Sequence, residues 1–95
     1  MYTVCEVKDR KGELSPTDFI VSTDTLTDAR KKAYEIVWKE HMRKGADRPI
    51  KKGVFKAGEK VKKVTWCPKC KKILWNDGKE WYALMKNGRL GKKVY

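Results

Sequence analysis

Two turn dipeptides, Asp77-Gly78 and Asn87-Gly88, constrain the fold more than any other feature of this sequence. Asp-Gly and Asn-Gly are the strongest signals for two-residue hairpin loops, because type I′ turns need positive φ at both positions. The apolar residues around them alternate as in strands. The pattern predicts a three-stranded antiparallel meander over about residues 71–76, 79–86 and 89–95.

A helix is predicted upstream of the meander. Thr25-Leu26-Thr27-Asp28 has the form of a capping box, with Asp28 in place of the usual Glu or Gln. From there apolar residues recur at helical spacing, and Gly45 after Lys44 is a typical stop. Earlier still, residues 2–7 and 18–22 have the pattern of short strands. We therefore expect an α+β fold, with one long helix of about 18–20 residues packed on an antiparallel sheet.

The positive charge is confined to the second half of the chain. The 95 residues hold 24 Lys and Arg against 12 Asp and Glu, a net charge of +12. Residues 1–50 contribute +1 and residues 51–95 contribute +11. A single domain is expected, with a near-neutral strand-strand-helix part (1–48) and a strongly basic β-rich part (49–95). Such a concentrated field calls for an anionic partner, of which nucleic acid is the commonest and an acidic protein surface an alternative.

The meander would present the binding groups on one face. With two-residue loops, Leu74 would lie opposite Trp81, and Met85 opposite Leu90. One face, with Leu74, Trp81, Ala83, Met85, Leu90 and Val94, is then expected to pack on the core. The other face would hold Ile73 and Leu84 together with aromatic and basic residues that stack bases and bind phosphate. A register slip of one residue exchanges the two faces.

The predicted nucleic-acid-binding residues combine cations with aromatic rings. They are Lys62, Lys63, Lys69, Lys71, Lys72, Trp75, Tyr82, Lys86, Arg89, Lys93 and Tyr95, with Lys51, Lys52, Lys56 and Lys60 as further phosphate contacts.

The motif Cys67-Pro68-Lys69-Cys70 is the most specific local signal. Over these four residues it resembles one half of a zinc ribbon or rubredoxin-type site, although Lys71 stands where such knuckles often have Gly. A structural zinc site needs four ligands, and no second Cys-x-x-Cys follows. Cys5 and His41 would complete a Cys3His set; alternatively, two chains of a homodimer share one zinc. A metal-free turn is the third interpretation.

Trp66-Cys67-Pro68-Lys69-Cys70 also resembles a thioredoxin-type redox motif. The hairpin signal at Asp77-Gly78 leaves too little room for the helix that this motif needs, and the chain has no later proline for the cis-Pro. The single His and the absence of a Gly-rich phosphate loop also argue against an enzyme.

The expected function is a small basic nucleic-acid-binding protein, either an accessory factor or a viral or plasmid-encoded regulator. The alternative is a protein-interaction module or inhibitor that docks on an acidic surface of a host protein. No apolar run reaches the roughly 18 residues of a membrane span, and the N-terminal residues do not have the pattern of a signal peptide. The odd number of cysteines disfavours a disulfide framework. We therefore expect a cytoplasmic protein, in the host cytoplasm if it is viral, without a membrane partner.

Overall fold

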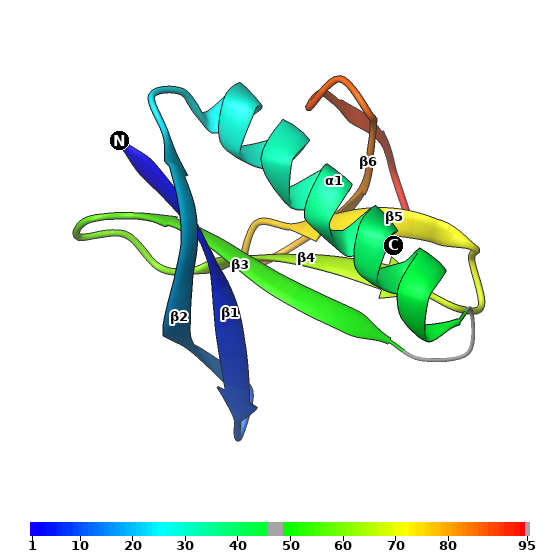
Figure 1. Ribbon diagram of the computed structural model, residues 1–95, viewed down its shortest axis with the longest axis horizontal. Helices are drawn as coiled ribbons and strands as arrows, with labels where there is room; N and C mark the ends of the chain where they lie inside the picture. Colours follow the sequence, from blue (N-terminus) through cyan, green and yellow to red (C-terminus); the bar gives the residue numbers. More distant parts are fainter. Residues whose placement is uncertain (46–48, 95) are drawn as a thin grey trace.

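A computed structural model describes residues 1–45 and 49–94 of the chain and contains one helix and one sheet of seven strands. Every strand pairs antiparallel with its neighbours, in the order β2-β1-β3-β4-β5-β6-β7 (Figure 1). The predicted α+β class with a helix on an antiparallel sheet is confirmed. The elements are β1 (Tyr2–Arg10), β2 (Glu13–Thr23), α1 (Leu26–Lys44), β3 (Ile50–Lys56), β4 (Lys62–Cys67), β5 (Lys72–Asn76), β6 (Trp81–Leu84) and β7 (Leu90–Lys93).

The helix begins and ends where the capping residues predict. The Thr25 hydroxyl accepts a hydrogen bond from the Asp28 N–H at 3.1 Å, and the Gly45 N–H donates to the His41 carbonyl at 2.9 Å. Gly45 has φ +94°, which a residue with a Cβ rarely adopts. At 19 residues, α1 is of moderate length rather than long. The described residues contain no helix that is long and apolar enough to cross a membrane.

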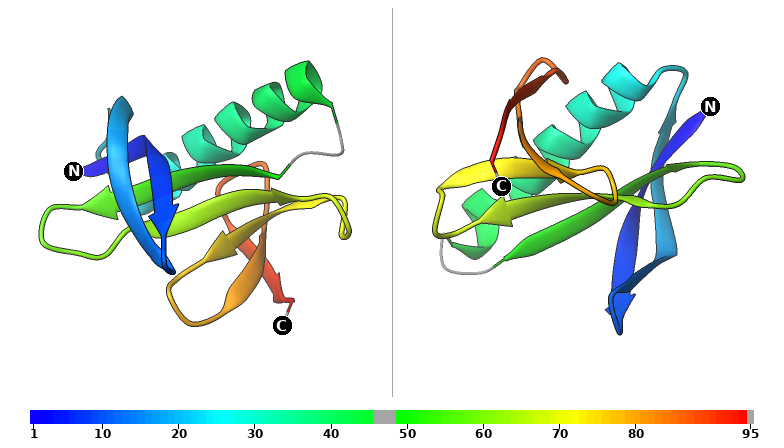
Figure 2. Two further views of the ribbon diagram at one scale, coloured as in Figure 1. Left: turned by 90° about the horizontal axis from the view of Figure 1, so that it is seen from below. Right: turned by 180° about the vertical axis from the view of Figure 1, so that it is seen from behind.

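Strand β3 joins the two parts of the sequence into one sheet. After the β1–β2 hairpin the chain crosses over through α1, and β3 then pairs with β1 on one side and β4 on the other. The rest of the sheet is a simple meander that ends at β7. Figure 2 shows β6 and β7 turning toward the helix. There Gly88 lies against the backbone carbonyl of Thr27 in the first turn of α1.

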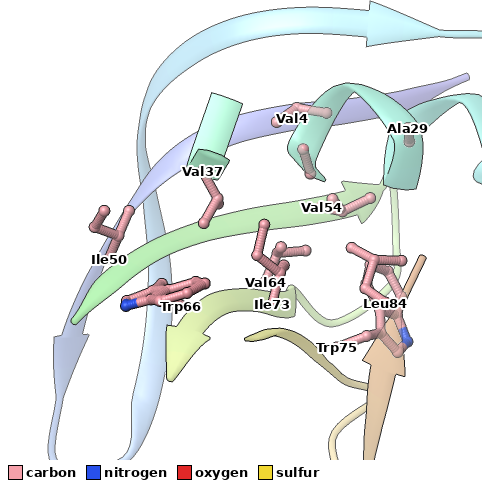
Figure 3. Packing of buried hydrophobic residues seen from close by; sticks show 11 residues of the cluster. Val4, Ala29, Val37, Ile50, Val54, Val64, Trp66, Ile73, Trp75 and Leu84 are labelled. Atoms are coloured by element: carbon pink, nitrogen blue, oxygen red, sulfur yellow. The ribbon is translucent and has the colours of Figure 1, made fainter. Parts of the chain in front are cut away.

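The core lies between α1 and one face of β1 and β3–β6. Ala29, Ala33 and Val37 of the helix are fully buried, and the two alanines let the backbones approach closely. Figure 3 shows Val37 above the centre of the sheet, where Val54 and Val64 lie. The wider row beneath the helix consists of Ile50, Trp66, Ile73, Trp75 and Leu84.

The meander has the predicted number of strands but a different register. The loop between β5 and β6 is four residues long rather than two, because the Asp77 carboxylate accepts the N–H groups of Lys79 and Glu80, both at 2.9 Å. Leu74 consequently pairs with Ala83 and not with Trp81.

The second hairpin also differs from the expected pairing and from the expected turn type. Leu90 pairs with Leu84 rather than with Met85, after a register shift. Tyr82 pairs with Lys93. Gly78 and Gly88 have positive φ, +105° and +89°, but Asp77 and Asn87 do not, so neither turn is of the predicted type I′.

The prediction of which meander face enters the core was wrong. Trp75 and Leu84, which were expected on the open face, are 1% and 4% exposed beneath the helix. Met85, which was expected in the core, is 50% exposed. Leu74 is also buried, on the sheet face opposite to Trp75, so both faces of β5 are covered.

Gly53 in β3 provides a test of how closely this strand packs against the side chains of Val7 and Val61. A Cβ at this position would collide with the Val7 side chain and would lie 2.7 Å from Cγ1 of Val61, and neither valine has a flexible end. We expect Gly53→Ala to destabilise the protein by about 1–3 kcal/mol, the usual cost of overpacking. Urea unfolding would measure it, with Gly91→Ala as control, because a Cβ at Gly91 makes only ordinary contacts at 3.4 Å. Equal midpoints for the two variants would contradict this packing.

Candidate functional site

Among the described residues, three of the fourteen basic side chains in 51–95 are held in ion pairs, so these three are poor phosphate ligands. Lys52 is the clearest correction: it is 3% exposed and its ammonium lies 2.9 Å from Glu6 and 2.5 Å from Glu40. Burial lowers the pKa of Lys52, but the two carboxylates outweigh this and raise it overall. This triad ties β1, β3 and α1 together. Lys51 pairs with Asp9 at 3.5 Å.

The proposed stacking residues are also mostly occupied within the fold. Trp75 was predicted to stack bases but is buried, with the Arg30 guanidinium 4.7 Å from its ring centroid. Tyr82 is half-buried, and its hydroxyl donates to Glu80 at 2.7 Å. The other oxygen of Glu80 accepts from Lys93 at 2.8 Å, which makes Lys93 the third paired cation. Tyr95 lies outside the described residues.

Eleven basic residues of the second half remain, and none has an acidic partner at ion-pair distance within the described parts of the chain. They form separate groups rather than the single surface that was predicted. One group adjoins the loops at the start of β4, one occupies the β4–β5 turn, and one belongs to the β6–β7 hairpin. In this order the members are Lys56, Lys60, Lys62, Lys63 and Lys79; Lys69, Lys71 and Lys72; Lys86, Arg89 and Lys92.

The group at the start of β4 lies beside carboxylates. A cleft of about 830 Å³ opens here between the β1–β2 hairpin, the β3–β4 loop and the β5–β6 loop. Lys63 is half-buried, with its ammonium 5.3 Å from the Trp81 ring centroid. The acidic and basic side chains of the cleft nearly balance, so it does not attract a polyanion. They are Asp9, Glu13, Glu59 and Asp77 against Lys60, Lys62 and Lys63.

The β4–β5 turn is the purely cationic group, and we call its residues 67–72 the knuckle. Lys69, Lys71 and Lys72 are all exposed. The Lys71 N–H donates to the Cys67 carbonyl at 2.8 Å and closes the turn, with Lys71 in the left-handed region at φ +55°. Gly is favoured after the second cysteine of such knuckles because it adopts this conformation freely. Lys71 has a Cβ and adopts it at a cost in steric energy.

Aromatic rings of α1 lie next to the knuckle. Trp66, the residue before Cys67, stacks on His41 with ring centroids 3.9 Å apart. Trp38 packs edge-on against Trp66 at 6.3 Å and against His41 at 5.4 Å. Trp66 and His41 are buried, but Trp38 is 43% exposed. Trp38 therefore offers a ring to solvent at the same end of the molecule as the three lysines.

Sequence reasoning missed Trp38 and Arg30 because both lie in a helix whose charges looked like a solvated face. The available signal was position: Trp38 is four residues after Tyr34 and three before His41, so all three lie on one side of α1. The helical spacing does not show against which side of α1 the meander packs, because that depends on tertiary contacts.

The structure does not assemble the four predicted zinc ligands. Cys67 and Cys70 share the knuckle, but Cys5 is buried in β1, where its thiol lies 3.6 Å from the Gly53 carbonyl. Gly53 pairs with Lys63, which is four residues and therefore about 13 Å along β4 from Cys67. His41 stacks on Trp66 on the helix side of β4, while Cys67 points to the other face. Within the described residues, no three His, Cys, Asp or Glu side chains are grouped to hold a metal.

The thiols of the knuckle and of β1 differ in chemistry. The Cys70 N–H lies 3.3 Å from the Cys67 sulfur, and this hydrogen bond, assisted by Lys69, holds the pKa of Cys67 below its usual value. Burial raises the pKa of Cys5, with a further contribution from Glu6. Strand β5 follows the knuckle directly, so the helix N-terminus that a thioredoxin-type motif uses is not there.

Comparison of the chain with protein-family models, with curated proteins and with solved structures found no match. The function therefore has to be argued from the site itself.

The thiol environments predict an order of alkylation. In metal-free reduced protein, iodoacetamide should modify Cys67 well before Cys5, because the thiolate is the reacting form and Cys5 is also shielded. The Cys67 reaction should persist below the usual thiol pKa of about 8.5, since a lowered pKa keeps the thiolate populated there. Mass spectrometry of peptides from samples quenched at successive times would measure both alkylation rates, with urea-unfolded protein as control. Similar rates for Cys5 and Cys67 in the folded protein would contradict these environments.

Proposed function

We propose that the protein binds nucleic acid through the knuckle and the adjoining end of α1, and that it prefers single-stranded segments. One observation carries the proposal: three exposed lysines, Lys69, Lys71 and Lys72, lie within a four-residue stretch and have no acidic partner among the described residues. Three like charges so close together repel one another, and a polyanion relieves this repulsion.

The exposed ring of Trp38 supports a preference for single strands. Phosphate contacts by lysine are independent of sequence and of strand number, but a base stacks on a protein ring only when it is unpaired. Trp66 and His41 hold Trp38 from behind, so stacking needs little rearrangement of the protein. Cations beside an exposed aromatic ring are the usual combination in single-strand binding surfaces.

The charge balance also favours nucleic acid over a small anion. The cleft beside the group at the start of β4 is lined by nearly equal numbers of acids and bases, whereas the lysines of the knuckle are exposed on a turn. An extended phosphate backbone can reach several lysines on such a turn. An acidic protein surface is the alternative partner, and it would bind the same lysines without needing Trp38 to accept a base.

Binding should be strongly salt-dependent. We expect fluorescence anisotropy with labelled single-stranded DNA or RNA to give a log–log slope of about −0.7 per phosphate neutralised. Changing Lys69, Lys71 and Lys72 together to Gln should reduce the magnitude of the slope by about 2, since three contacts of about 0.7 are removed.

A matched variant controls for net charge. Lys8, Arg10 and Lys11 are three exposed cations of the β1–β2 hairpin, and changing them to Gln removes the same charge from the near-neutral part of the chain. This variant should keep nearly the original slope. Equal losses in both triple variants, or affinity weaker than about 1 mM at low salt for the unchanged protein, would refute binding at the knuckle.

Trp38→Ala tests the stacking contribution. Base–aromatic stacking contributes about 1–3 kcal/mol per base, so single-strand affinity should fall about 5- to 150-fold with little change in the salt slope. Phe19→Ala is the control, because Phe19 is 68% exposed and lies on edge strand β2, away from the knuckle. Double-stranded DNA should bind both variants and the unchanged protein alike. An unchanged single-strand affinity for Trp38→Ala would remove the stacking role and leave an interaction by charge alone.

A further inference from the structure

The two thiols of the knuckle lie three residues apart on one turn, the spacing of paired zinc ligands. Cys67 ends β4 and Cys70 lies in the turn, so one tight loop presents both sulfurs, and both residues are partly exposed. The Cys70 N–H is directed at the Cys67 sulfur at 3.3 Å, and the left-handed Lys71 reverses the chain immediately afterwards. Backbone N–H groups that face a sulfur stabilise it as a thiolate, which is the form that binds a metal.

This cysteine pair has no further ligand in the described part of its own chain. Cys5, the remaining cysteine, is 1% exposed and separated from Cys67 by strand β3 and about 13 Å along β4. His41 is packed against Trp66 on the opposite side of the sheet. Zn²⁺ in structural sites is four-coordinate and tetrahedral, and it accepts four thiolates. Two cysteines on an exposed turn leave two coordination positions for another molecule.

We propose that one zinc ion links two copies of this chain, with Cys67 and Cys70 of each copy as its four ligands. A two-fold axis through the zinc makes the contact self-complementary, so each copy contributes the same pair of residues. The four thiols lose their protons on binding, and the Zn²⁺ with four thiolates carries a charge of −2.

The lysines around the knuckle are compatible with this arrangement. Each copy brings Lys69, Lys71 and Lys72 near the zinc, and an anionic centre attracts them and offsets part of their mutual repulsion. Without the metal the same six lysines keep the two copies apart. The dimer should therefore depend on the zinc and not form through apolar contact.

The experiment measures zinc content and mass together, without nucleic acid, so its result is independent of the proposed function. Protein reduced with a phosphine is titrated with zinc sulfate and analysed by light scattering after size exclusion. We expect saturation at one zinc per two chains and a mass twice the 11.1 kDa of the chain. Removing the metal with EDTA should restore the mass of a single chain. Co²⁺ in place of Zn²⁺ should give the absorption of a tetrahedral tetrathiolate centre.

Cysteine variants assign the ligands. Cys67→Ser and Cys70→Ser should each lose both zinc binding and dimerisation, while circular dichroism shows that the fold is kept. Cys5→Ala is the matched control, because it removes a thiol that is buried elsewhere, and it should keep both properties. Saturation at one zinc per single chain, a dimer that survives EDTA, binding that survives either knuckle variant, or no binding at micromolar zinc would each overturn the proposal.

Discussion

The packing of Trp75 beneath the helix determines which side chains of the neighbouring strands face the core and which face solvent. Its ring is 1% exposed and lies under the Arg30 guanidinium, whose pKa is lowered because it is buried there, although Tyr2 offsets part of this effect. Trp75 pairs with Val64 on one side and Tyr82 on the other, so its orientation fixes which residues of β4, β5 and β6 face the helix. On β5 the Trp75 ring contributes more buried area than Leu74, which faces the other side of the sheet.

This orientation explains why the cations divide into separate groups. With Trp75 inward, Lys63 and Lys72 point to the opposite face of the sheet, where Lys63 meets the Trp81 ring and Lys72 lies opposite Cys67. Two of the three acids of the second half are already engaged near its loops: Glu80 holds Lys93 and Tyr82, and Asp77 closes its own turn. The knuckle, farthest along β4 from these acids, keeps its lysines uncompensated. The uneven charge of the sequence thus becomes a local feature of the surface.

Local signals predicted local structure well, whereas the choice between two faces depended on distant residues. The capping residues of α1 and the positions of both meander turns were predicted correctly, although the turn type was not, because each position depends on a few neighbouring backbone groups. Both faces of β5 and β6 carry apolar side chains, so alternation alone could not identify the core side. The helix that selects Trp75 over Leu74 lies more than thirty residues earlier, and its Ala29 and Ala33 make room for the larger ring.

The zinc prediction also combined a local part, the turn with Cys67 and Cys70, and a long-range part, its grouping with Cys5 and His41. The turn over residues 67–72 follows from its own sequence, but the grouping of Cys5 and His41 with it was inferred only from the scarcity of such residues. The fold uses both elsewhere: the Cys5 thiol lies against the Gly53 carbonyl, and His41 supports Trp66. A pair of thiols without nearby ligands and a trio of lysines without nearby acids then occupy one turn. For each we propose a partner of opposite charge: a metal cation for the thiolates and a phosphate backbone for the lysines.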